Sequence, residues 1–239
     1  MSDIEKWFYC YILRQNRFKF SAFGREVNKY IQDIEIPDNI PSWVYNMKIK
    51  FPQTKNKDVK VNISTKDWKS FNYTDIFIIR KGFYNKKPSH NIDGDIPFLG
   101  ATEKNNGVTE YYSLDDIENA SKTGDENNAP IEDKIFPKNA VCVTNNGSVG
   151  YAFYQSTEFT CSHDVNPLYR KDGIEFNPHT GLFIATVIME DRYRWTYGRK
   201  WRPERMIKST LKLPVDKQGN PDWNFMENYI KSLPYGDRI

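Results

Sequence analysis

The side chains best suited to chemistry lie between Arg192 and Lys208, where basic and aromatic residues alternate. Seven Lys and Arg residues stand in this segment against one acid, Glu204. Arginine neutralises phosphate or donates two parallel hydrogen bonds to guanine, and aromatic rings offer flat surfaces on which bases stack. The segment therefore favours contact with a nucleic acid through Arg192, Arg194, Tyr197, Arg199, Lys200 and Arg202. The alternative is an exposed strand face on which long basic side chains cover Tyr193, Trp195, Tyr197 and Trp201.

Two asparagine-glycine turns supply a second group of candidate residues. Asn105-Asn106-Gly107 and Asn145-Asn146-Gly147 each stand between apolar runs, and Asn-Gly provides the positive φ that tight hairpins require. The segment Gly147-Ser148-Val149-Gly150 either cradles a phosphate with backbone N–H groups or only forms the turn, and these interpretations are compatible. Polar and basic residues of these and neighbouring loops are expected to touch DNA: Lys81, Lys86, Lys87, Lys104, Asn105, Asn146 and Ser148.

No pattern in the chain predicts a catalytic centre. Asn166-Pro167-Leu168-Tyr169 is close to the Asn-Pro-Pro-Tyr loop with which amino-methyltransferases hold a flipped base. Its second proline and a glycine-rich cofactor loop are missing, so the end of a strand is the preferred interpretation and a methyltransferase fragment the alternative. Cys161-Ser162-His163-Asp164 cannot form a proton relay along one strand, because adjacent side chains point to opposite faces. His90 and His179 have no partners at metal-ligand spacing, so we expect neither metal nor cofactor.

The composition indicates a soluble globular protein. Its 239 residues are 38% hydrophobic and 15% aromatic, which is enough for a core, and 34 Lys and Arg against 31 Asp and Glu leave a net charge of only +3. The absence of a long apolar run and of a signal peptide predicts no membrane contact and no secretion. Cys10, Cys142 and Cys161 stand in apolar surroundings, which is typical of buried thiols in a reducing compartment, so we expect a cytoplasmic protein without disulfides.

Short strands separated by turns predict an α+β fold with a small mixed, mostly antiparallel sheet and flanking helices. Strands are expected at 96–100, 107–112, 140–144, 151–155 and 165–169, a strand or short helix at 73–82, a buried helix at 181–189, and a helix followed by a strand at 5–20. The acidic segment 115–133 is poor in apolar residues and predicts an exposed, mobile loop.

The last helix is predicted from its cap and its apolar stripe. Asn220 can cap a helix and Pro221 suits its first position. The stripe that follows is expected to bind a partner or to pack on the chain's own sheet: Phe225, Met226, Tyr229 and Ile230.

A degenerate repeat brackets the chain. Its first copy is Arg17-Phe18-Lys19-Phe20, Gly24-Arg25, the strand Ile34-Glu35-Ile36-Pro37, and Pro41-Ser42-Trp43. Its second copy is Arg192-Tyr193-Arg194-Trp195, Gly198-Arg199, the strand Leu211-Lys212-Leu213-Pro214, and Pro221-Asp222-Trp223. Since the second copy closes the main body of the chain, we expect the first to close a preceding unit. This predicts the tail of such a unit at 1–45, a linker at 46–66 and a complete module at 67–239.

From about Trp68 to Tyr235 the chain resembles the target recognition domain of DNA specificity subunits from restriction-modification systems, of the type I and related BcgI-like kinds. The resemblance rests on the order of several short motifs, which include Tyr73-Thr74-Asp75-Ile76-Phe77, Ile96-Pro97-Phe98-Leu99-Gly100-Ala101-Thr102, Asn146-Gly147-Ser148-Val149-Gly150 and Leu211-Lys212-Leu213-Pro214. Such subunits carry two recognition domains in tandem, which would account for the repeat.

The resemblance implies a non-catalytic protein that reads a half-site of double-stranded DNA in the major groove. Modification (methyltransferase) subunits would carry the methyl donor, and the terminal helix 223–233 would bind their helices. A restriction subunit or a second copy of the chain are further expected partners. An interaction module that does not bind DNA stays open as another class of function.

Overall fold

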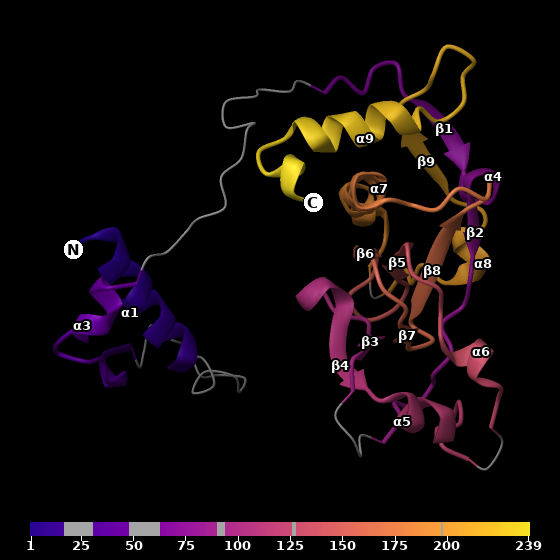
Figure 1. Cartoon of the computed structure of the whole chain (residues 1–239). Coiled ribbons are helices and arrows are strands. Elements are labelled where there is room, and N and C mark those ends of the chain that lie inside the picture. The colour runs from indigo at the N-terminus through magenta and orange to yellow at the C-terminus, as the bar shows by residue number, and fades with distance from the viewer. Residues whose placement is uncertain (17–30, 48–62, 90–93, 126–127, 197) are drawn as a thin grey trace. The chain divides into compact units, whose positions relative to one another are not determined.

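The computed structural model describes residues 1–16, 31–47, 63–89, 94–125, 128–196 and 198–239. The chain divides into two compact units, residues 1–53 and 54–239, and each is described by itself (Figure 1). In the described parts of the chain, no helix is both long enough and apolar enough to span a membrane.

The first unit contains helix α1 (Asp3–Gln15), the short 3-10 helix η2 (Ile31–Asp33) and helix α3 (Ser42–Tyr45). Ser2 and Glu5 form a capping box at the start of α1, and the Tyr45 hydroxyl donates a hydrogen bond of 3.0 Å to Glu5 Oε1. The helix predicted in 5–20 is thereby confirmed, whereas the strand after it and the Gly24-Arg25 motif lie outside the described residues. Cys10 is exposed, so the prediction that all three thiols are buried was wrong.

The strand predicted at 34–37 is absent, because this segment is irregular and pairs with no strand of the described unit. Its counterpart in the second copy is strand β9, which has a partner strand in β1. The repeat in sequence therefore does not extend to this element.

The second unit has the predicted α+β fold, but its strands form three small sheets where the sequence predicted one. The strands are β1 (Lys69–Asn72), β2 (Phe77–Ile79), β3 (Ile96–Leu99), β4 (Val108–Tyr112), β5 (Ala140–Thr144), β6 (Ala152–Gln155), β7 (Thr160–Cys161), β8 (Val165–Arg170) and β9 (Thr210–Leu213). They form the sheets β1-β9, β2-β8-β5-β6 and β4-β3-β7, and every pair except β3 with β7 is antiparallel. The helices are α4 (Tyr73–Ile76), α5 (Leu114–Asn119), α6 (Ile131–Lys134), α7 (Pro178–Glu190), α8 (Pro203–Met206) and α9 (Trp223–Ser232), with 3-10 turns η3 (Asn105–Gly107), η4 (Arg192–Arg194) and η5 (Gly236–Arg238).

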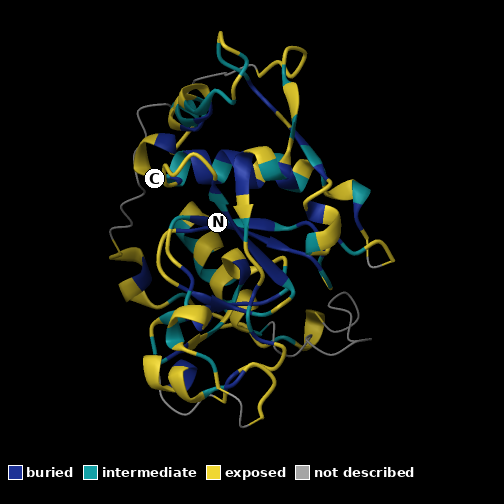
Figure 2. Cartoon of the chain, turned by 90° about the vertical axis from the view of Figure 1, so that its right-hand side faces the viewer, coloured by how far each residue is buried: buried dark blue, intermediate teal, exposed yellow. Residues whose placement is uncertain are grey.

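Strand β5 lies inside the four-stranded sheet, between β8 and β6, and all five of its residues are buried. Figure 2 shows buried strands in the middle of the view. Side chains alternate along a strand, so Val141 and Val143 enter the cluster under α7 while Ala140 and Cys142 enter the cluster on the opposite face. Cys161 joins the second cluster, and burial raises the pKa of both thiols. An uninterrupted apolar run such as Ala-Val-Cys-Val is what a strand covered on two sides requires.

Helix α7 covers the four-stranded sheet. It begins with a capping box between Asn177 and Thr180. Gly181 faces Tyr154 of β6 so closely that a β-carbon on Gly181 would overlap the tyrosine ring. The Tyr154 hydroxyl donates to Asn139 Oδ1 at 2.5 Å and fixes that ring.

Helix α9 packs on α7, and its stripe is largely covered. Met226 is fully buried and Ile230 is 9% exposed, whereas Phe225 is 39% exposed. Tyr229 is half-buried and packs edge-on against Phe183 of α7. The stripe predicted as a partner-binding surface therefore serves mainly to attach α9 to its own domain.

The cap of α9 is Asp222, whose side chain accepts a hydrogen bond of 2.9 Å from Phe225 N. The predicted cap, Asn220, lies two residues earlier, in a turn where its N–H donates to Asp216 Oδ1. Pro221 forms a β-bridge with Val215, so neither predicted residue belongs to the helix.

The acidic segment 115–133 is not the open loop that its composition predicts. It contains α5 and α6, and Asp116 and Ile117 are buried. Lys134 Nζ lies between Ile117 O at 3.0 Å, Glu118 O at 2.8 Å and Asn128 Oδ1 at 2.5 Å. Ile117, with Ala120 and Ile131 packed against the same cluster, and Lys134 thus hold the described parts of this polar segment on the domain.

Candidate nucleic-acid interface

The two asparagine-glycine turns close hairpins, as predicted, and they lie against each other. The first joins β3 to β4, with φ of +51° at Asn105, +53° at Asn106 and +82° at Gly107. The second joins β5 to β6, with φ of +64° at Gly147. A β-carbon on Gly147 would lie 3.5 Å from Ala101 in the first loop, which shows how closely the loops approach.

Side-chain amides attach the first turn to β6. Asn106 Nδ2 donates to Tyr154 O at 3.0 Å, and Gln155 Nε2 donates to Asn106 O at 2.8 Å. Lys104 and Asn105 are exposed at the tip of this turn. The backbone is therefore held while the side chains of these two predicted residues are presented outward.

A buried polar network holds the second turn. Asn145 Nδ2 donates to Asn166 Oδ1 at 2.6 Å and to His163 O at 3.1 Å, and Asn166 Nδ2 donates to Arg80 O at 2.9 Å. Asn146 Nδ2 donates to Asp164 Oδ1 at 3.0 Å. The three side-chain amides and the Asp164 carboxylate thus order the loops around β8.

The position of Asn166 argues against a role in holding a flipped base. Its side chain is fully buried within β8 and its amide is engaged by Asn145 and Arg80. A base-binding amide must face a pocket. The preferred interpretation of the Asn-Pro-Leu-Tyr motif was the end of a strand; the motif does belong to a strand, but it lies within β8 and not at its end.

A third segment joins the turns after α7. The Arg192 guanidinium carbon lies 4.5 Å from the centre of the Tyr151 ring, and the Tyr151 hydroxyl donates to Glu103 Oε2 at 2.7 Å. Glu103, Tyr151 and Arg192 come from three different loops, so this contact ties those loops together. Neither Glu103 nor Tyr151 stands in a sequence pattern that could have predicted the contact.

The basic and aromatic segment is not a strand face, contrary to the alternative interpretation. It forms η4, an irregular loop and α8. Trp195 and Trp201 are buried and stacked at 5.1 Å with an interplanar angle of 11°, and Trp201 N donates to Asn145 O. They act as core side chains and not as platforms for bases, whereas Tyr193 is 78% exposed. Tyr197 lies outside the described residues.

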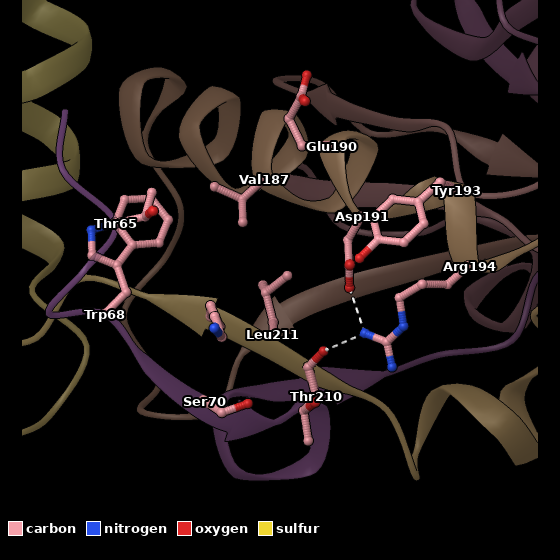
Figure 3. A pocket seen from close by; sticks show the side chains of 11 residues that line it. Thr65, Trp68, Ser70, Val187, Glu190, Asp191, Tyr193, Arg194, Thr210 and Leu211 are labelled. Atoms are coloured by element: carbon pink, nitrogen blue, oxygen red, sulfur yellow. Dashed lines mark hydrogen bonds and ion pairs between the residues drawn. The ribbon is translucent and has the colours of Figure 1, made fainter. Parts of the chain in front are cut away.

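The guanidinium of Arg194 is committed to the domain itself. Arg194 Nη1 donates to Asp191 Oδ2 at 2.6 Å and to Thr210 O at 3.3 Å, as the dashed lines in Figure 3 show. Arg194, Asp191 and Thr210 all line a cleft of about 510 Å³. Trp68 and Leu211 line the same cleft. Arg194 therefore differs from Arg192, which has no acidic partner among the described residues.

The other residues predicted to contact DNA fall into separate groups. Lys104, Asn105, Asn146, Ser148 and Arg192 gather at the two turns, and Arg199, Lys200 and Arg202 flank Trp201, which is bonded to the second turn. Arg199 lies over Trp195 at 5.3 Å. Lys81 is exposed beside Gly82, which packs on the backbone of Ser162 and Val165.

Lys86 and Lys87 lie apart from the turns. Lys87 Nζ pairs with Glu110 Oε1 at 2.5 Å and stands over Phe98. Lys86 lines a cleft of about 290 Å³ beside α5, together with Asp116 and Asp125. Acidic neighbours make these two lysines poor candidates for contact with DNA phosphates.

No group of three or more His, Cys, Asp or Glu side chains is arranged to hold a metal within the described residues. The candidate site therefore consists of hairpin loops and the segment after α7, which expose Lys104 and Arg192 and stand on an α+β core. A family model described as the type I restriction modification DNA specificity domain matches residues 65–234, and the chain belongs to this family. The resemblance drawn from the motifs is thereby confirmed.

Individual relatives are longer than this chain. The chain is 34% identical over 205 residues to the specificity subunit S.BcgI of a type II restriction enzyme from Heyndrickxia coagulans, across 81% of this chain and 54% of that protein. Among solved structures, the S subunit of a type I restriction-modification system from M. genitalium matches with a TM-score of 0.47 and 13% identity, over 72% of this chain and 40% of that one. The HsdS subunit from Thermoanaerobacter tengcongensis matches with a TM-score of 0.46 and 12% identity, over 77% and 39%. The chain thus spans about half the length of the curated relative.

Proposed function

We propose that this chain recognises a sequence in double-stranded DNA as the specificity component of a restriction-modification system, and that other subunits carry the catalysis. The observation that carries the proposal is the meeting of two hairpin turns with the segment after α7, which together present Lys104, Asn105 and Arg192. The major groove is wide enough to admit a two-stranded β-ribbon. Membership of the family supports the same function.

The test of this proposal is the dependence of binding on salt. Each phosphate that a basic side chain neutralises lowers the slope of log affinity against log salt concentration by about 0.9. Fluorescence anisotropy of a labelled duplex titrated with the chain should therefore give affinity that falls steeply between about 50 and 200 mM salt. Binding that is absent at low salt, or that does not change with salt, would contradict the proposal and favour an interaction module.

The proposed protein partner is a modification subunit, with a restriction subunit or a second copy as further candidates. Because Met226 and Ile230 are covered by α7, only the outer part of α9 around Phe225 and Tyr229 is offered to such a partner. Light scattering of the pure chain, alone and mixed with a methyltransferase subunit of the same system, measures this association. A mass that stays that of the monomer in both cases would contradict it.

A further inference from the structure

The turn between β5 and β6 leaves several backbone N–H groups without acceptors. Asn145 N and Gly150 N donate to Asp164 O and Thr144 O at 2.8 Å each. Between them, the N–H groups of residues 146–148 have no acceptor in the described part of the chain. Consecutive N–H groups in a turn with a left-handed residue, here at position 147, form a concavity that attracts anions.

Arg192 stands directly against this turn. A β-carbon on Gly150 would lie 2.8 Å from Arg192 Cβ, and the Arg192 guanidinium stacks on Tyr151, the next residue. The stacked guanidinium keeps its N–H groups available, because no acid pairs with it among the described residues. Arginine held in one orientation loses less side-chain entropy when it binds an anion.

Two carboxylates lie close to this place, and both are engaged. Glu103 accepts a hydrogen bond from Tyr151, and Asp164 accepts one from Asn146 Nδ2 and lies 3.2 Å from His163 Nε2. Each carboxylate thus already has a partner in the loops: Tyr151 for Glu103, and Asn146 and His163 for Asp164. Glu103 still opposes an anion by simple repulsion, which gives a way to test the site.

The geometry points to a phosphate-binding site made of the N–H groups of residues 146–148 and the guanidinium of Arg192, with Tyr151 as the residue that positions the arginine. The ligand is a phosphate of the DNA backbone. Arg192 has a counterpart in Arg17 of the sequence repeat, which suits a contact that is independent of base sequence. The inference rests on the proposed function for its biological ligand, whereas inorganic phosphate probes the site directly.

The experiment is a titration of the isotope-labelled full chain with inorganic phosphate, followed by amide NMR signals. We expect the signals of residues 146–148 to shift in the wild type, and the Arg192→Ala variant to bind about tenfold more weakly. The exposed Lys217, in the turn between β9 and α9, provides the matched control: Lys217→Ala removes the same charge and should leave the titration unchanged. Glu103→Gln should tighten phosphate binding, because it removes the repulsion and keeps an acceptor for Tyr151.

With duplex DNA, Arg192→Ala should weaken binding to every sequence alike and reduce the salt slope by about 0.9. Arg192→Lys should recover only part of the affinity, because the ammonium cannot stack as a flat group. Unshifted signals at 146–148, or duplex binding by Arg192→Ala equal to that of the control, would overturn the site. Failure of the wild type to bind any duplex would instead overturn the proposed function, and the phosphate titration would still decide the site.

Discussion

The side chain of Lys134 links α6 to the end of α5 and to Asn128. Its ammonium group donates to two backbone carbonyls and one side-chain amide, and the residue is fully buried. Lys134→Met keeps the length of the side chain but leaves buried carbonyls without donors, which should destabilise the domain by about 2–4 kcal/mol. Urea unfolding followed by circular dichroism measures the loss. Lys138→Met, at an exposed position, is the control, and equal midpoints for both variants would contradict this role.

Lys104 and Arg199 should contribute differently to recognition. Lys104 projects from the first turn, whereas Arg199 covers Trp195 and has a counterpart in Arg25 of the repeat. If Lys104 contacts a base, Lys104→Ala should alter the preference among sites by roughly 1–3 kcal/mol. Arg199→Ala should weaken binding to all sequences alike or destabilise the fold. Competition among randomised duplexes distinguishes these outcomes, and the reverse pattern would mean that the two roles are exchanged.

At the scale of elements, the contact of α7 with β6 depends on Gly181. Alanine would raise helix propensity by about 1 kcal/mol. Its β-carbon would overlap the ring of Tyr154, which Asn139 holds in place, and overpacking of this kind costs about 1–3 kcal/mol. Gly181→Ala should therefore lower the free energy of unfolding. Gly198 has open space around its α-carbon, so Gly198→Ala is the control in thermal unfolding. A stabilised Gly181→Ala variant would show that the helix can shift.

Glu227 joins α9 to the start of α7, and it should make this junction sensitive to acid. The side chain of Lys231 and then that of Asn177, which donates at 2.8 Å, lower the pKa of Glu227 below its usual 4.5. A lowered folded-state pKa contributes stability above pH 4.5 that is lost as the pH falls through the folded-state value. Unfolding midpoints of the wild type should therefore fall more steeply below pH 4.5 than those of Glu227→Gln. Parallel curves would contradict the contribution.

The sequence predicts elements best where a local pattern and its burial agree. The apolar run of β5 and the Asn-Gly turns require nothing beyond their neighbours, and both are found where predicted. The strand expected at 34–37 failed because a strand needs a partner, which β9 has in β1 and which the pattern itself does not reveal. The cap of α9 failed because Asn220 is bonded in a competing turn.

The candidate site was predicted only in part, for a similar reason. The Asn-Gly turn predicts Lys104 and Asn105, and the basic composition of residues 192–208 predicts Arg192. The contact of Glu103, Tyr151 and Arg192 joins residues far apart in sequence, so no spacing rule could find it. The commitment of Arg194 to Asp191 and the burial of Trp195 also depend on tertiary packing, which a count of basic and aromatic residues overlooks.

For the whole molecule, the second unit should fold and bind without the first. Its clusters are built from residues of the second unit, and the family match lies within it. A fragment of residues 63–239 should therefore unfold cooperatively and retain the affinity of the full chain for duplex DNA. Calorimetry and anisotropy test the two expectations, and loss of cooperative unfolding would show that residues 1–62 are needed for stability.

Phe183 of α7 contacts one residue near the start of the described part of this unit and one near its end. Trp68, just before β1, lies 5.8 Å from its ring, and Tyr229 of α9 lies 5.9 Å from it. Residues near the start and near the end of the described part of this unit are thus neighbours, which is the arrangement that favours insertion of a domain into a host protein at one surface position. In evolutionary terms, one recombination event that exchanges the coding segment would transplant all the loops proposed to contact DNA and leave the recipient's scaffold undisturbed.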